Sequence, residues 1–221
     1  MRTENDFDAW LQRLQTATAE NFLGIRQEIL IWIEHARPEE LEKLRSWIQN
    51  TLRNIRGGQV NANTLEPFST GLTMRQDPAA APILGELVLL MEGSEVEDVA
   101  EALGDMGPAA AGAVPFLMQL VRRAGEDTAW TRAKAASSLG QIGDRSAIPV
   151  LTDALSDPRS SVRLMTVEAL GKLRGVEAIP RIQHVAEHDA DPQVREEAKR
   201  VVTDLVENLD TPPRTNAPGG S

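Results

Sequence analysis

The sequence predicts an all-α protein in which pairs of helices stack into an elongated solenoid. One observation is an internal repeat: the segment Leu-Gly-Asp-Met-Gly that begins at Leu103 returns as Leu-Gly-Gln-Ile-Gly at Leu139 and, less closely, as Leu-Gly-Lys-Leu-Arg at Leu170. A second is a proline series at Pro82, Pro115, Pro149 and Pro180, with spacings of 33, 34 and 31 residues. A period in the low thirties built from two short helical patterns is typical of an α-solenoid.

Each expected repeat contains two helices with separate packing roles. In the first helix, Ala135, Leu139 and Ile142 recur at helical spacing and predict one buried stripe. The proline opens the second helix at a position where its missing N–H costs nothing. We expect about four and a half such units over residues 64–209, the last being a single helix over 193–209.

Residues 1–56 predict an N-terminal helical hairpin with a break near residues 16–19, because apolar residues recur every three or four positions and Pro38 opens a new helix. The polar, glycine-containing stretch 57–63 is the expected connector to the solenoid. Trp10, Trp32 and Trp47 all lie in the hairpin. Two roles stay open for it: capping the apolar end of the solenoid, or docking, including formation of a homodimer.

Composition excludes several classes of function. The absence of cysteine removes disulfides and thiol chemistry and favours a cytoplasmic location. A formal charge of −10 and an aromatic content of 4% argue against nucleic-acid binding. No apolar stretch reaches the roughly 20 residues of a membrane helix, so no membrane partner is expected. The tail 210–221 is of low complexity and is expected to be disordered.

The chain resembles a known repeat family. The Leu-Gly-x-apolar-Gly core, the Ala-Ile/Val-Pro start of the second helix, the Asp157-Pro158 turn and the Val162-Arg163 pair are similar to HEAT repeats of the phycobilisome-lyase type. The resemblance is strong over about 95–205, weak over 64–91 and absent from 1–60. It implies a right-handed stack of antiparallel helix pairs whose second helices line the concave side. Lyase activity does not follow, because this repeat serves many functions.

Acid–arginine pairs six residues apart recur at the repeat boundaries. Each acid lies in the turn between units and each arginine early in the next helix, so stacking predicts a structural ladder that ties neighbouring turns together. The pairs are Glu126 with Arg132, Asp157 with Arg163, and Asp189 with Arg195.

A candidate binding strip follows from the register of the second helices. Residues one and four places after each proline are expected to project away from the core. Arg123, eight places after Pro115, is expected to belong to the same surface. An apolar group flanked by polar side chains is the usual mark of a protein-binding surface. The strip comprises Ile83, Glu86, Phe116, Gln119, Arg123, Val150, Asp153, Arg181 and His184.

Candidate catalytic and metal-binding residues are weak. His184 and His188 share a helix face, but Val185 stands where an HExxH motif requires glutamate. Metal hydroxylases built on HEAT-like repeats use repeated His-Glu pairs, and this sequence has no His-Glu dipeptide. The serine pairs 137–138 and 160–161 lack the strand-to-helix elbow of a nucleophile. We therefore expect no catalytic residue, metal or cofactor.

The sequence thus favours a non-catalytic scaffold or adaptor that holds a protein or peptide partner on its concave face. The alternative is a phycobilisome-lyase-like protein that binds a bilin or a phycobiliprotein subunit.

Overall fold

A computed structural model describes residues 4–125 and 128–208, and within these ranges the secondary structure is entirely helical. The expected tail 210–221 and Glu126 lie outside the described residues. Short 3-10 helices precede α4, α7, α9 and α11. The α-helices are α1 (Glu4–Gln15), α2 (Ala19–His35), α3 (Pro38–Arg56), α4 (Glu66–Met74), α5 (Ala81–Val88), α6 (Ser94–Asp105), α7 (Val114–Val121), α8 (Ala129–Ile142), α9 (Ile148–Ala154), α10 (Ser160–Lys172), α11 (Ile179–His188) and α12 (Pro192–Glu207).

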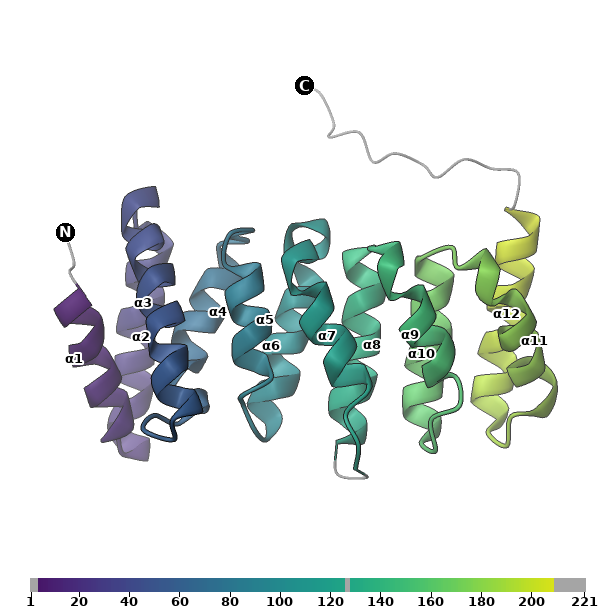
Figure 1. Cartoon of the computed structure of the whole chain (residues 1–221), viewed down its shortest axis with the longest axis horizontal. Helices are drawn as coiled ribbons and strands as arrows, with labels where there is room; N and C mark the ends of the chain where they lie inside the picture. Colours follow the sequence, from purple (N-terminus) through teal and green to yellow (C-terminus); the bar gives the residue numbers. More distant parts are fainter. Residues whose placement is uncertain (1–3, 126–127, 209–221) are drawn as a thin grey trace, which may run out of the picture.

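The helices form two layers that run along the length of the molecule (Figure 1). The first layer contains α2, α4, α6, α8, α10 and α12, and the second contains α3, α5, α7, α9 and α11. The predicted all-α solenoid is confirmed, and the four pairs from α4 to α11 followed by α12 give the expected four and a half units. Every second helix from α5 to α11 has proline in its first turn, as the proline series predicts.

Successive first-layer helices approach closely through glycine. A Cβ added at Gly140 of α8 would lie 2.7 Å from Cα of Ala169 in α10, and one at Gly104 of α6 would lie 2.9 Å from Cα of Ser138. A side chain at either position would push the two backbones apart. The glycine that follows each repeat leucine is therefore a helix-contact residue.

The N-terminal region forms three helices. The predicted break near residues 16–19 separates α1 from α2, and α2 and α3 are the antiparallel pair and continue the two layers, with α1 beside them (Figure 1). The core does not break at residues 57–63, because one apolar cluster runs from Phe7 to Leu205. Phe68 of α4 packs against Trp10 and Trp47, with ring centroids 6.1 and 5.2 Å apart. These N-terminal helices thus cover the first helix of the expected solenoid.

Replacing a central first-layer leucine should destabilise the whole stack. Leu139 and Leu170 are fully buried, so Leu139→Ala or Leu170→Ala should each lower the free energy of unfolding by about 2–5 kcal/mol. Leu23→Ala is the control, because Leu23 is 70% exposed and its truncation should be nearly neutral. Urea titration followed by circular dichroism measures all three, and near-neutral changes at both core positions would contradict the packing register.

Two glycine-to-alanine substitutions should have opposite effects. Gly140→Ala should destabilise the chain by about 1–3 kcal/mol, since the new methyl group meets the α10 backbone. Gly24 lies inside α2 with open space where a Cβ would stand, so Gly24→Ala should stabilise by about 0.5–1 kcal/mol through helix propensity. Thermal unfolding of both variants tests the contact, and equal shifts would count against it.

Candidate functional site

The ladder residues form two buried ion pairs between consecutive repeats. Arg132 at the start of α8 donates from Nε and Nη2 to the two carboxylate oxygens of Asp157, at 2.7 and 3.1 Å. Arg163 of α10 binds Asp189 in the same two-pronged way, at 2.6 and 2.7 Å. Planar guanidinium–carboxylate pairing of this kind is strong and geometrically specific. We call the arginine–aspartate contacts of this edge the arginine ladder.

The pairing within the arginine ladder differs from the sequence prediction. Arg163 does reach Asp157, six residues earlier, but its Nη1 donates to the backbone carbonyl of Asp157 at 2.8 Å. Arg195 likewise donates to the carbonyl of Asp189 at 2.6 Å. Each carboxylate instead accepts from the arginine of the preceding unit, which lies 25 or 26 residues away. The residues were predicted but the partners were not, because sequence spacing within one turn does not show which helix stacks above it.

The electrostatics of the ladder are those of a structural ion pair. The hydrogen bond from Arg163 lowers the pKa of Asp189 against the opposing effect of burial, and the same bond raises the pKa of Arg163. Both side chains are buried or nearly so, at 4% and 13% exposure. The carboxylate and the guanidinium thus satisfy each other's hydrogen bonds, and the pair needs no ligand.

The Arg163–Asp189 pair should make stability depend on acid. A carboxyl whose pKa is lowered by folding contributes stability above its unfolded pKa, near 3.9, and that contribution is lost as pH falls through the folded pKa. We expect the free energy of unfolding to drop below about pH 5, and Asp189→Asn to flatten the drop while lowering stability at pH 7 by about 1.5–3 kcal/mol. Urea unfolding between pH 2.5 and 7 measures both, and an unchanged slope in the variant would contradict the assignment.

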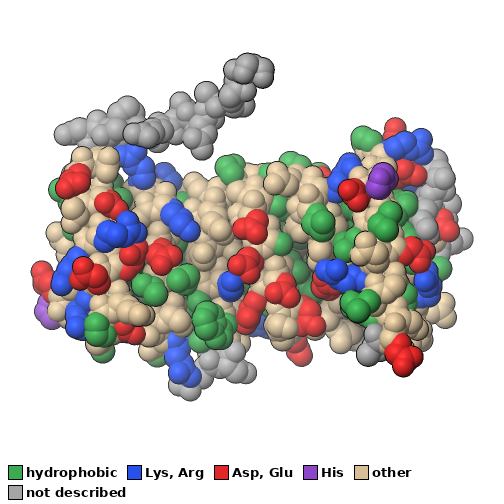
Figure 2. Space-filling model, turned by 180° about the vertical axis from the view of Figure 1, so that it is seen from behind, with side chains coloured by type: hydrophobic (Ala, Val, Ile, Leu, Met, Phe, Trp, Pro, Cys, Tyr) green, Lys and Arg blue, Asp and Glu red, His purple; other side chains and the backbone are tan. Residues whose placement is uncertain are grey.

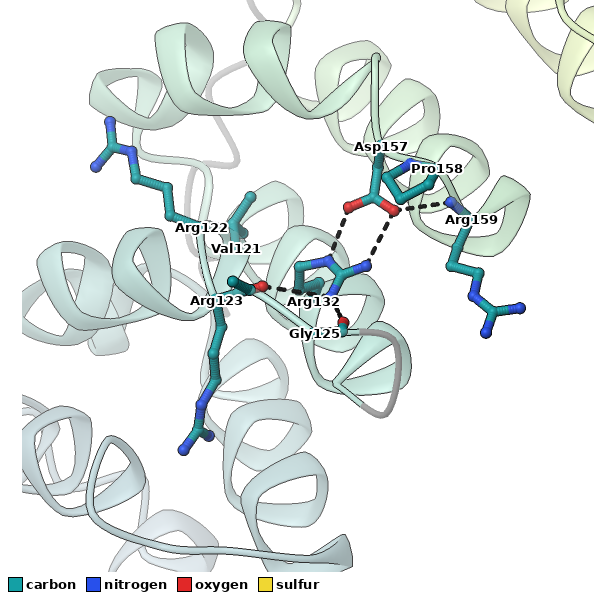
Figure 3. A pocket seen from close by; sticks show the side chains of 9 residues that line it. Val121, Arg122, Arg123, Gly125, Arg132, Asp157, Pro158 and Arg159 are labelled. Atoms are coloured by element: carbon teal, nitrogen blue, oxygen red, sulfur yellow. Dashed lines mark hydrogen bonds and ion pairs between the residues drawn. The ribbon is translucent and has the colours of Figure 1, made fainter.

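A pocket of about 310 Å³ lies beside the ladder, between the end of α7 and the turn before α10 (Figure 3). Its floor is the Arg132–Asp157 pair, and three further arginines surround it. The guanidinium groups of Arg122, Arg123 and Arg159 point away from the pocket in different directions (Figure 3). They do not converge on one point, so the pocket is not arranged to hold an anion.

The candidate binding strip is only partly exposed. Val150 is 1% exposed, so the prediction that it lies on the surface is wrong. Phe116 and Ile83 are half-buried, and the Phe116 ring lies where a side chain at Gly85 of α5 would stand. The apolar column therefore packs successive second helices together. At Phe116, the residue one place after proline faces the preceding second helix, α5, and not the solvent alone.

The polar part of the strip does lie on the surface. Gln119, Asp153, Arg181 and His184 are exposed or partly exposed, on α7, α9 and α11. Arg181 donates to Oγ of Ser156 in the previous unit at 2.9 Å. The two remaining charged residues, Glu86 and Arg123, are half-buried, and Glu86 is paired with Arg56 of α3.

The histidines and serines have structural surroundings. His184 and His188 stack with ring centroids 4.5 Å apart. Among the described residues, no group of three His, Cys, Asp or Glu side chains could hold a metal ion. Ser138 donates its hydroxyl hydrogen bond toward the carbonyl of Ala100 in α6, 2.7 Å away. No helix of the described ranges is both long and apolar enough to cross a bilayer.

Sequence reasoning missed the first-layer face. Trp130 is 63% exposed at the start of α8, and Ile31 and Met74, which are 49% and 72% exposed, line a cavity of about 270 Å³ between α2 and α4. A second cavity, of about 620 Å³, lies between the turn before α6 and the start of α8. Trp130 interrupts an otherwise alanine-rich, weakly amphipathic helix, and that was the available signal.

Comparisons with known proteins agree with this architecture. Residues 114–203 match the family model described as HEAT repeats. The chain is 36% identical over 86 residues to deoxyhypusine hydroxylase of Chaetomium globosum, a match that covers 38% of this chain. It spans only a quarter of that relative's length. Two engineered proteins of known structure share the fold. The first has a TM-score of 0.53 and 16% sequence identity, and the match covers 94% of this chain and 100% of that protein. The second has a TM-score of 0.50 and 18% identity, and the match covers 91% of this chain and 97% of that protein.

Proposed function

We propose that this protein is a non-catalytic scaffold or adaptor that holds a protein or peptide partner on the face formed by its second helices, the concave side in the repeats it resembles. The observation that carries the proposal is the row of solvent-accessible polar side chains at equivalent positions of consecutive second helices, from Gln119 through Asp153 to His184. A repeat array that presents equivalent positions at regular intervals suits an extended partner.

The interior of the solenoid supports this role. Every buried side-chain nitrogen and oxygen of the described residues has a hydrogen-bond partner, so the array needs no ligand to complete its core. Charged residues of the row, such as Asp153, lie outside the arginine ladder and are free to contact another molecule. A cytoplasmic location is consistent with the absence of cysteine.

The similarity to deoxyhypusine hydroxylase raises an enzymatic alternative. The match covers a minor part of both chains, and no His-Glu dipeptide occurs in this sequence. Repeats of this kind are shared by proteins of different function, so the similarity supports a common scaffold more strongly than a common reaction.

The resemblance of the Leu-Gly motifs to phycobilisome-lyase repeats favours a second candidate, a protein that binds a bilin or a phycobiliprotein subunit. Mixing the purified chain with a bilin tests it, since an enclosed chromophore shifts its visible absorption band. An unshifted spectrum at micromolar protein leaves the adaptor proposal as the better one.

Affinity capture from the native cell tests the adaptor proposal. A partner retained by the wild-type chain should be lost at least tenfold by Asp153→Arg combined with His184→Glu, because both side chains are accessible on the second-helix face. The melting temperature should stay nearly unchanged. Lys172→Glu is the matched control, since Lys172 is exposed on α10 of the first layer. Equal retention by all three proteins would place the partner elsewhere.

A further inference from the structure

We propose that the 620 Å³ cavity between α6 and α8 binds an arginine side chain of a basic peptide segment carried by a partner protein. This inference deepens the proposed adaptor function and rests on it, but it uses the opposite, first-layer face of the molecule. Three observations carry it: an interruption of the arginine ladder, carboxylates at the cavity that pair with no described residue, and an exposed tryptophan in the first turn of α8.

The arginine ladder stops at α6. Arg132 and Arg163 each stand seven residues before the repeat leucine, Leu139 or Leu170. The equivalent residue before Leu103 is Val96, which is buried and has no hydrogen-bond donor in its side chain. No guanidinium therefore extends from this position of α6 toward the next turn, and Val96 instead lines the cavity.

The cavity has an excess of negative charge. Glu92 and Glu97 line it, and neither carboxylate forms an ion pair with a described residue. Arg123 also lines it, so one cation faces two carboxylates. Residues 76–121 contain eight acidic residues and no lysine or arginine. Basic residues outside this stretch pair with Asp77, Glu86 and Glu101, and Glu92 and Glu97 are not among these pairs. Acidic side chains gather over the middle of this face (Figure 2). The charge complements a cationic ligand.

Trp130 of α8 directly precedes Thr131, which lines the cavity. Lys134 of α8 pairs with Glu101 of α6 at 2.7 Å. One helical turn earlier on each helix stand Trp130 and Glu97, because residues four apart share a helix face. The indole is 63% exposed, an unusual exposure for so large an apolar side chain. A guanidinium stacked on the ring would reach the Glu97 carboxylate at its edge.

The ladder itself indicates arginine as the ligand. Where the position is filled, Arg132 contacts both oxygens of Asp157 and also the carbonyl of Gly125, at 2.6 Å. Arginine combines planar pairing to a carboxylate with stacking on an aromatic ring, and the ammonium of lysine cannot do both. A partner's arginine would thus supply at α6 the kind of group that the chain lacks there.

The experiment measures fluorescence anisotropy of a labelled peptide of four Gly-Arg repeats with the full-length chain in low-salt buffer. A second peptide has citrulline, which is isosteric and uncharged, in place of each arginine. Wild-type protein should bind the arginine peptide at least tenfold more tightly than the citrulline peptide. Glu97→Gln and Trp130→Ala should each weaken arginine-peptide binding at least fivefold, with folding checked by circular dichroism. Glu92→Gln provides a second cavity variant should either of these unfold.

Glu187→Gln is the matched control, because it makes the same change of charge at an exposed position on α11. It should bind like the wild type. No binding of the arginine peptide, equal binding of the citrulline peptide, or equal affinities of the cavity variants and the control would each overturn the inference. Any of these results leaves the adaptor function intact if a captured partner is still lost on changing Asp153 and His184, so the two failures are distinguishable.

Discussion

The close contact between successive first-layer helices is the constraint on which the rest of the molecule depends. At Gly140 the backbone of α10 lies where a side chain would stand, and at Gly104 the backbone of α8 does the same. Contacts this close admit one register, because sliding by a residue would bring a side chain into the gap. The fixed register then sets which turns of neighbouring repeats face each other.

The arginine ladder is a consequence of that register. Arg132 meets Asp157, and Arg163 meets Asp189, because the turn of the next unit is held beside the start of each first-layer helix. The reverse does not hold, since α6 and α8 stay in close contact through Gly104 although Val96 provides no ladder arginine. Helix packing, together with the Lys134–Glu101 ion pair and the hydrogen bond from Ser138 to Ala100, therefore holds α6 against α8 without a ladder arginine.

The apolar ends of the helical stack are covered differently at the two termini. At the N-terminus a group of aromatic rings covers the first repeat, and it consists of Phe7, Trp10, Trp32, Trp47 and Phe68. The indole N–H of Trp10 donates to Glu28, and that of Trp47 donates to Asp8. At the C-terminus α12 has no second helix of its own unit. Its inner face is buried through Val194, Ala198, Val201 and Leu205, and its outer face is charged. A polar outer surface at the last helix is what a solenoid needs to end in water.

The amino-acid sequence alone determined the repeat, the helices and most of the inward residues. The Leu-Gly and proline periods mark the repeat along the chain, and the spacing of three and four residues is a local property of a helix. The sequence also identified the four residues of the ladder's two ion pairs, Arg132, Asp157, Arg163 and Asp189. Tertiary structure decided the ladder partners, the burial of Val150, the half-burial of Phe116 and the cavity between α6 and α8. These features depend on how each helix is placed against the next one. That placement is set by contacts between residues about 30 positions apart, and no short window of the sequence contains both partners.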